Sequence, residues 1–333
     1  MTVDHETATN VNAQRLVVFA DWNHWVPQLI IGELLPLLEK RDQLQLVGMC
    51  LPNSTMHAKR ILRHCSSRIL DWCKNPSRHH QIPAPVDPQQ LAQRFGFELF
   101  TSENEIRLET TLDRLKPDIL VSIFWKRKFT EKFLDRFKQA INYHNGTTPD
   151  YRGLRATAWS VYNNEISSGF TIHRVNDGLD CGNVLATHSV PIEPRDSVFD
   201  VEFRKTQRAI KCLPDILDAM ENNFEGIPQT QLHKYNRVQS IERLCTIEHP
   251  DTLSSDEILR RIRAFGSVRV RHMQRDLWLS GLADRLPSGT DSARHALNLA
   301  DGSWTIGRSD SVRARVESIW SWFSRASSKR ENA

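Results

Sequence analysis

The sequence predicts an α/β fold, with a Rossmann-like, open and mostly parallel sheet followed by a smaller C-terminal domain. The length of 333 residues exceeds one average domain and fits a large domain plus a smaller one. Apolar runs at 15–20 and 44–51 flank a segment at 26–40 that has apolar residues at helical spacing. Strand, helix and strand is how a parallel sheet begins, and a further apolar run at 119–124 is predicted to be a central strand.

Alternating helices and strands are predicted along the rest of the first domain. In the helix at 26–40, Pro27 is tolerated in the first turn, whereas Pro36 is expected to introduce a kink. A long amphipathic helix at 197–220 begins at a serine cap. Between these two helices we expect helices at 56–73, 91–95, 105–115 and 130–139, a loop at 75–88, and strands at 97–100, 140–144, 170–174 and 184–190.

Three parts of the chain are predicted. Residues 1–14 are polar and lack an apolar segment, so they are expected to form a disordered leader. Residues 15–225 are expected to form the larger domain, and a break at Gly226 to open the smaller C-terminal domain, 226–333. In this last part we expect a helix from Ser254, short strands on either side of a turn at 300–303, and a helix at 312–323.

Composition indicates a globular cytoplasmic protein without membrane contact. Hydrophobic residues make up 39% of the chain and charged residues 25%, and no run of about 18 apolar residues occurs. Six cysteines include no C-x-x-C pair, which favours reduced thiols. No metal is expected, because one group of residues lacks the spacing of a structural zinc site: His57, His64, Cys65, Cys73, His79 and His80.

Charge is distributed unevenly along the chain. The net charge is +4, but the part from Ile258 onward holds 13 Arg and 1 Lys against 7 acidic residues, a net +7, which leaves −3 for the remainder. A basic C-terminal part can bind tRNA or another polyanion. It can equally be an ordinary solvated face, and both interpretations stay open.

Polar residues gather at the predicted end of one strand and in a later loop. Asn142 and His144 lie two apart at the end of the strand at 140–144, so their side chains share one face. Asp180 lies in a turn-rich loop that follows the strand at 170–174. Ligands of open α/β sheets bind outside the carboxyl ends of the strands, so an amide, an imidazole and a carboxylate form a candidate acyl-transfer site there.

These three residue types suit the transfer of a formyl group to an amine without a metal. The Asn142 amide can donate to the developing oxyanion, an effect worth ~3 kcal/mol in comparable sites. His144 can take the proton of the attacking amine. A carboxylate at Asp180 would favour the charged imidazole and help to return a proton to the leaving nitrogen.

Simpler roles remain open for the same residues. Asn142 could be a turn residue and His144 a packed histidine, and Asp180, like Asp177, could be a turn former. The joint placement of the three residues favours the catalytic interpretation. His173, on the strand before the second loop, is expected to be a packed or substrate-facing residue that supports the site.

Two segments carry a resemblance to a known family. Residues 142–153 (NYHNGTTPDYRG) resemble an N-x-H-P-S-x-x-P-x-Y-R-G loop, and residues 169–173 with 177–182 resemble a G-x-T-x-H…D-x-G-x-D-x-G run. In this order they resemble the 10-formyltetrahydrofolate-dependent formyltransferases, which include glycinamide ribonucleotide, methionyl-tRNA and sugar-nucleotide formyltransferases. The resemblance covers 116–210 well and 15–115 in outline, and it implies that Asn142, His144 and Asp180 are the catalytic residues.

The resemblance also implies binding residues. The pterin of 10-formyltetrahydrofolate, a co-substrate, is expected to bind at Phe124, Trp125, Lys126, Lys128, Asp177 and Gly178. The acceptor is expected near the end of the first strand, where aromatic rings can stack on a base or a sugar. The residues assigned to it are Trp22, Asn23, Trp25, Arg152 and Gly153.

Three positions depart from the family pattern. The family's His-Pro-Ser is His144-Asn145-Gly146 here, which is expected to reshape the loop. Residues 21–25 lack a glycine-rich phosphate cradle, which counts against glycinamide ribonucleotide as acceptor. Residues 126–128 are basic where the family's pterin pocket is apolar, and can face the glutamate tail of the folate or solvent.

The leading hypothesis is an enzyme that formylates a small-molecule amine, such as a nucleotide-linked aminosugar, because residues 159–164 resemble the sugar branch. A methionyl-tRNA formyltransferase is the second hypothesis, supported by the basic C-terminal part and by residues 254–266, which resemble the start of that branch's C-terminal domain. A formyltetrahydrofolate hydrolase and a non-catalytic folate-binding protein are the others. The oligomeric state stays open, with a dimer among the possibilities.

Overall fold

The computed structural model describes only part of the chain, in ten ranges: 13–52, 87–194, 196–230, 241, 243–265, 268–272, 275–279, 282–283, 296–302 and 304–306. Several predicted features lie outside these ranges, so the structure does not test them. They are residues 1–12 of the leader predicted at 1–14, the helix at 56–73 with the cysteines and histidines near it, residues 75–86 of the loop predicted at 75–88, and the helix at 312–323. Gln14, placed in the leader by the sequence, is instead the first residue of a strand.

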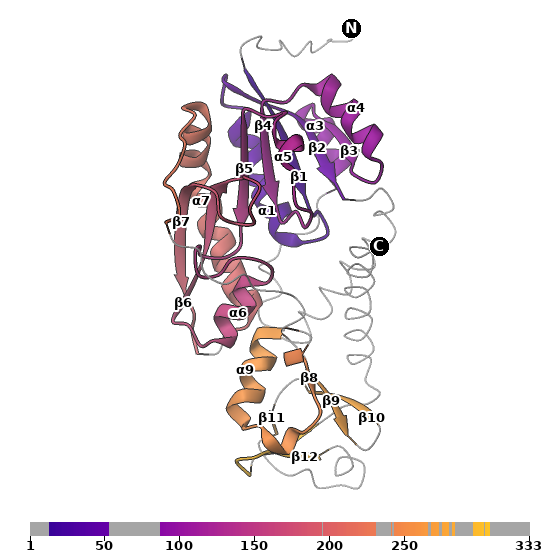
Figure 1. The fold of residues 1–333 in the computed structure, drawn as a ribbon, viewed down its shortest axis with the longest axis vertical. Helices are drawn as coiled ribbons and strands as arrows, with labels where there is room; N and C mark the ends of the chain where they lie inside the picture. The colour runs from indigo at the N-terminus through magenta and orange to yellow at the C-terminus, as the bar shows by residue number, and fades with distance from the viewer. Residues whose placement is uncertain are drawn as a thin grey trace.

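A seven-stranded sheet forms the centre of the larger part, in the order β3-β2-β1-β4-β5-β6-β7 (Figure 1). Pairs from β3 to β5 are parallel, and the pairs β5–β6 and β6–β7 are antiparallel. The mostly parallel sheet with helices confirms the predicted fold class. Its strands are β1 (Gln14–Ala20), β2 (Leu44–Leu51), β3 (Glu98–Thr101), β4 (Ile119–Ile123), β5 (Gln139–His144), β6 (Ser167–Arg174) and β7 (Val184–Pro191).

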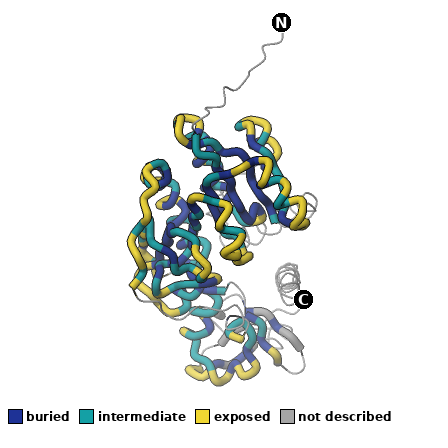
Figure 2. Tube along the Cα trace, turned by 45° about the horizontal axis from the view of Figure 1, so that its top comes forward, coloured by how far each residue is buried: buried dark blue, intermediate teal, exposed yellow. Residues whose placement is uncertain are grey.

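Helices cover both faces of this sheet. Side chains alternate along β1, so Leu16 and Val18 join the core under α1 (Trp25–Leu38) and α7 (Val198–Glu221). Val17 and Phe19 face the opposite side, where they pack with residues of α4 (Glu105–Leu115) and α5 (Glu131–Leu134). Figure 2 shows buried residues in the interior of the larger part and exposed residues along its outside, where helices also carry them.

Most elements agree with the predicted bounds, and β2 and α4 agree at both ends. The helix predicted at 130–139 is wrong beyond Leu134. There the backbone N–H of Lys138 donates to the Asp118 carbonyl at 2.8 Å, and Gln139 already belongs to β5. The end of the predicted helix therefore belongs to the sheet and to the turn before it, although the spacing of its phenylalanines is that of a helix. Helix α3 (Pro88–Phe95) begins three residues before its predicted start at 91.

A short helix that the sequence did not predict, α6 (Ala156–Tyr162), follows the loop at 145–155. Its N-cap is Arg155 in the left-handed conformation, with a φ of 58° and no side-chain cap bond. The usual sequence signal of a helix start is therefore missing. Helix α7 carries that signal in full, since the side chain of Ser197 and that of Asp200 form a capping box.

The C-terminal part holds two three-stranded sheets, in the orders β10-β9-β8 and β11-β13-β12. Helix α9 (Ser255–Phe265) begins one residue after the predicted start and shares a small core with them. Strands β12 and β13 lie on either side of a turn described at 300–302, within the turn predicted at 300–303. The other elements are η2 (Pro250–Thr252), β8 (Thr246–Ile247), β9 (Val268–His272), β10 (Arg275–Leu279), β11 (Leu282–Ala283), β12 (Ala296–Asn298) and β13 (Trp304–Ile306).

The end of the first domain at residue 225 stays a prediction. Past that point, Ile227 still exchanges two backbone hydrogen bonds with Val184 of β7, each 2.8 Å long. Further along, α9 contacts α6, where the Tyr162 hydroxyl donates to Glu257 at 2.8 Å. Over the described residues, no helix is long and apolar enough to cross a membrane.

Candidate active site

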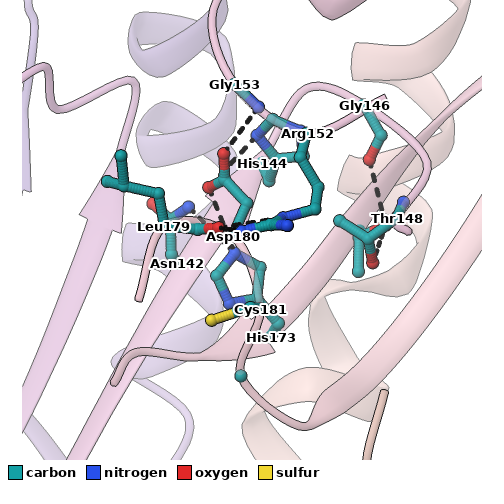
Figure 3. Close-up of polar contacts among 12 residues, drawn as sticks. Asn142, His144, Gly146, Thr148, Arg152, Gly153, His173, Leu179, Asp180 and Cys181 are labelled. Atoms are coloured by element: carbon teal, nitrogen blue, oxygen red, sulfur yellow. Dashed lines mark hydrogen bonds and ion pairs between the residues drawn. The ribbon is translucent and has the colours of Figure 1, made fainter. Parts of the chain in front are cut away.

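The carboxyl end of β5 and the loop between β6 and β7 bring the predicted catalytic residues together (Figure 3). Asn142 and His144 lie on β5, where they pair with His173 and Thr171 of the antiparallel strand β6. Asp180 comes from the loop that returns the chain to β7, and it adopts a φ of 49°. Two features therefore position the site: the register between the antiparallel strands β5 and β6, and the tight loop that carries Asp180.

His144 is nearly buried and has a defined neighbour at each ring nitrogen. Its Nε2 lies 2.7 Å from the Tyr151 carbonyl oxygen, which can only accept, so Nε2 carries a proton and donates. Its Nδ1 lies 3.4 Å from Oδ1 of Asp180. Burial lowers the pKa of His144, and the Asp180 carboxylate and the Tyr151 carbonyl only partly oppose this. The ring is neutral near pH 7, with Nδ1 as the nitrogen that can accept a proton.

His173 links Asn142 to the same carboxylate. Its Nδ1 donates to the Arg174 carbonyl at 2.7 Å, so its Nε2 accepts a hydrogen bond from Nδ2 of Asn142 at 3.2 Å. The same Nε2 lies 3.6 Å from Oδ1 of Asp180. The four side chains therefore form one connected group. The sequence placed His173 next to the site, and the structure adds its contacts to Asn142 and Asp180.

Asp180 is held by the loop that follows β5. The Gly153 N–H donates to Oδ2 of Asp180 at 2.8 Å, and Arg152 donates twice to the Leu179 carbonyl, at 3.0 and 2.6 Å. Burial alone would raise the pKa of the Asp180 carboxyl, but the attraction of the His144 and His173 rings when they carry a proton, and the hydrogen bond from the Gly153 N–H, hold it well below its usual range. Asp180 is therefore a carboxylate at every pH near neutrality.

The structure gives a reason for the glycine at position 146, where the family pattern His-Pro-Ser has a serine. A Cβ atom at this position would lie 2.6 Å from Nε2 of His144 and 2.2 Å from the Tyr151 carbonyl oxygen. No residue with a side chain fits there unless the loop moves. The glycine therefore allows the backbone to pass directly over the hydrogen bond between His144 and Tyr151.

Two of the residues predicted to bind the folate, Phe124 and Trp125, lie in the loop after β4, and their rings pack on opposite sides of the sheet. Phe124 adopts a φ of 57°, and its ring stacks on Tyr143 at 6.0 Å. Trp125 instead packs on Phe19 at 5.1 Å, in the core of the opposite face of the sheet. The structure therefore does not bring the Trp125 ring to the side of the sheet that holds Phe124.

The other predicted folate residues are charged or lie in turns. Lys126 forms an ion pair with Asp21 at 3.0 Å, and Lys128 is exposed. Asp177 is exposed, and the Gly178 N–H donates to Oδ1 of Asn176 at 3.1 Å. Lys128 and Asp177 therefore keep polar groups at the surface, whereas Lys126 is engaged with Asp21.

One residue that the sequence assigned to the acceptor, Trp22 after the end of β1, does not face a ligand. Trp22 is 0% exposed and lies in the core, so the prediction that its ring stacks on a ligand is wrong. The tight turn after Ala20 directs the ring inward, and Gln28 donates to the Trp22 carbonyl at 2.7 Å. Trp25 is half-buried against Phe199 at 5.2 Å, and Asn23 is exposed. Both keep surface that a ligand could contact.

Three residues near the site were not found from the sequence. His24 caps α1 by accepting from the Val26 N–H at 3.3 Å, and its Nε2 lies 3.8 Å from Glu202. Lys205, on the same helix as Glu202, is completely buried. A signal for Lys205 existed, since it falls in the apolar stripe of α7 that also holds Val201 and Ala209. Within the described ranges, no group of three or more His, Cys, Asp or Glu side chains could hold a metal ion.

Comparison with known proteins finds a matching family model and several relatives. Residues 73–217 match the family model described as Formyl transferase. The chain is 28% identical over 114 residues to GDP-perosamine N-formyltransferase of Brucella melitensis biotype 1, which covers 34% of this chain and 44% of that protein. It is 32% identical over 156 residues to methionyl-tRNA formyltransferase of Finegoldia magna, which covers 46% and 50% respectively. The chain thus spans about half the length of these curated relatives.

A solved structure shares the fold. A sugar N-formyltransferase from Shewanella sp superposes with a TM-score of 0.58 at 17% identity, over 83% of this chain and 99% of that chain. At this level of identity, the similarity concerns the arrangement of helices and strands.

Proposed function

Residues 73–217 belong to the formyl transferase family, and from this we propose that the protein transfers a formyl group from 10-formyltetrahydrofolate to the amine of a small acceptor, such as a nucleotide-linked aminosugar. The proposal rests mainly on one observation. The Asp180 carboxylate lies within 3.6 Å of both His144 and His173, and His173 is bonded to Asn142. An amide donor, a neutral imidazole and a carboxylate are thereby combined in one site.

Each side chain has a role in this transfer. The Asn142 amide has two N–H donors and uses one on His173, so the second can donate to the formyl oxygen as negative charge develops on it. Nδ1 of His144 takes the proton that the amine loses as its nitrogen bonds to the formyl carbon. Asp180 then stabilises the resulting imidazolium, which can return the proton to the folate nitrogen as the old carbon–nitrogen bond breaks.

The residues present fit the folate co-substrate. The stacked rings of Phe124 and Tyr143 lie on the same side of the sheet as α1 and α7, at the carboxyl ends of β4 and β5. The Tyr143 hydroxyl is buried and has no hydrogen-bond partner among the described residues. The half-buried Phe124 ring keeps surface that a flat heteroaromatic ring could contact, and the exposed ammonium of Lys128 suits the glutamate tail.

A small acceptor is favoured over tRNA by the contacts of α9. Its three arginines are engaged within the protein: Arg260 and Arg261 with Glu257, and Arg263 with the Asp196 carbonyl. They are therefore not a bare basic surface for a phosphate backbone. Support for an aminosugar also comes from the GDP-perosamine N-formyltransferase relative and from the accessible surface of Asn23 and Trp25. The cytoplasmic location and the dimer stay predictions of the sequence.

An acceptor screen tests the proposal. The protein is incubated with 10-formyltetrahydrofolate and a panel of nucleotide-linked aminosugars, and products are read by mass spectrometry. We expect a mass gain of one formyl group in place of one hydrogen on at least one aminosugar. Formate release without an amine would indicate the hydrolase instead, and formylation of charged initiator tRNA alone would indicate the tRNA enzyme.

A further inference from the structure

Lys205 carries a buried ammonium group immediately behind the catalytic loop. Its side chain is 0% exposed, and Nζ donates to the Asn145 carbonyl at 3.0 Å, to Oγ1 of Thr157 at 2.8 Å and to Oγ of Ser168 at 3.4 Å. An ammonium has three N–H donors, so these three acceptors satisfy it completely. Lys205 therefore ties together the loop after β5, the first turn of α6, and β6.

Asn145 is also held by a second residue of the same helix. Its Nδ2 donates to Oε1 of Glu202 at 3.1 Å. Glu202 and Lys205 are three apart on α7 and share one face of it. The carbonyl and the side-chain amide of Asn145 are therefore bound by opposite charges from one helix.

This arrangement is placed directly next to the site. Asn145 follows His144, and after it the backbone turns at Gly146, where glycine makes the loop easier to deform. The burial of an ammonium costs several kcal/mol, and an apolar side chain would fill the same stripe of α7 at a lower cost. A role in the site is the physical reason to keep a lysine there.

Besides its hydrogen bonds, Lys205 also affects the pKa of His144. Lys205 lowers the pKa of His144, as His173 also does, whereas Asp180 and the Tyr151 carbonyl raise it. Burial lowers the pKa of Lys205 itself to about 7, and Glu202 opposes this. Since His144 titrates below its ordinary value of 6.5, Lys205 is charged in the range where His144 titrates.

We propose that Glu202 and Lys205 are positioning residues: they clamp Asn145 from α7 and thereby fix the imidazole of His144 in its neutral, productive orientation. They do not contact the reacting atoms. The inference rests on the proposed function, because it assigns these residues to the same catalytic histidine.

The first test compares Lys205→Met with Lys211→Met, the same change at an exposed position of α7. The histidines are labelled with carbon-13, and the pKa of His144 is measured by NMR titration of the folded protein, with the His144→Gln variant assigning the signal. We expect the pKa to rise in Lys205→Met and to stay unchanged in Lys211→Met. An unchanged pKa in Lys205→Met would overturn the electrostatic part of the proposal. The titration needs no acceptor, so it remains decisive even if the proposed transfer is never observed.

The second test uses kinetics and a double-mutant cycle. Glu202→Met and Asn145→Ala should each lower kcat about 100-fold, the effect expected of a misplaced catalytic group, and leave the KM for folate nearly unchanged. Because both substitutions remove the same hydrogen bond, Glu202→Met should have little further effect in an Asn145→Ala background. Additive losses, or a kcat equal to wild type, would overturn the clamp. This cycle also decides the matter if Lys205→Met fails to fold.

Discussion

One carboxylate oxygen of Asp180 lies 3.4 Å from Nδ1 of His144, while Nε2 of the same ring donates to the Tyr151 carbonyl. The backbone contact fixes which nitrogen carries the proton, and the carboxylate faces the nitrogen that receives one. A proton arriving at Nδ1 therefore meets a negative charge. The pair is arranged to hold an imidazolium for the short time between proton uptake and proton return.

Removal of His144 or Asp180 should impair chemistry more than binding. His144→Ala is expected to lower kcat by about 100-fold to 10,000-fold, because general acid–base catalysis is worth that much. Asp180→Asn should also lower kcat strongly, since the imidazolium loses its counter-charge. Stopped-assay product formation gives kcat, and calorimetric titration with a folate analogue gives affinity, which should stay within a few-fold of wild type. Equal kcat values in wild type and His144→Ala would contradict the mechanism.

The pH dependence should show a neutral histidine. Burial lowers the pKa of His144 below 6.5, and the mechanism needs the neutral form, so activity is lost as pH falls through that lowered pKa. The acid limb of kcat/KM is therefore expected below pH 6.5. In Asp180→Asn the carboxylate that raises this pKa is gone, so the residual activity should extend to still lower pH. An acid limb above pH 7 in the wild type would contradict this assignment.

The sequence predicted much of the fold and of the site because both are encoded in short patterns. Apolar runs such as 119–124 predict buried strands, and the spacing of Asn142 and His144 places both at one strand end. Two aspects depend instead on packing between distant segments. The Trp22 side chain points into the core, and the residues next to it in the sequence do not predict this direction. The contacts of Lys205 join α7 to residues that are 37 to 60 positions away in the sequence.

Buried Lys205 should make stability depend on pH in the alkaline range. Its pKa is about 7 in the folded protein and 10.5 when unperturbed, so between these values the unfolded chain binds more protons. The free energy of unfolding should therefore rise with pH from about 7 to 10.5 through this group and be unaffected by it below 7. Denaturant unfolding across this range should show a smaller slope in Lys205→Met and an unchanged slope in Lys211→Met. Equal slopes in Lys205→Met and wild type would show that the lysine does not titrate as described.

Substitution of Gly146 should disturb both stability and catalysis. In Gly146→Ala the new methyl group would lie 2.2 Å from the Tyr151 carbonyl oxygen and 2.6 Å from Nε2 of His144, so the loop must shift. Overpacking of this kind costs about 1–3 kcal/mol, and kcat should fall because the hydrogen bond of His144 is displaced. The matched control is Gly32→Ala in α1, where a Cβ meets nothing within 4 Å and the helix should gain up to about 1 kcal/mol. Thermal unfolding and kinetics of the two variants separate the two outcomes, and equal behaviour would contradict the close approach at Gly146.

The two tryptophans after β1 should behave differently when they are replaced. Trp22 is 0% exposed, so Trp22→Ala should destabilise the protein by about 3–5 kcal/mol, as large cavities in a core do. Trp25 is half-buried on the side of Phe199 and keeps surface next to exposed Asn23, so Trp25→Ala should cost less stability and raise the KM for the acceptor. Denaturant unfolding measures the first effect, and acceptor kinetics at saturating folate measures the second. If instead Trp22→Ala were to retain full stability and lose acceptor affinity, its ring would have to leave the core and contact the ligand.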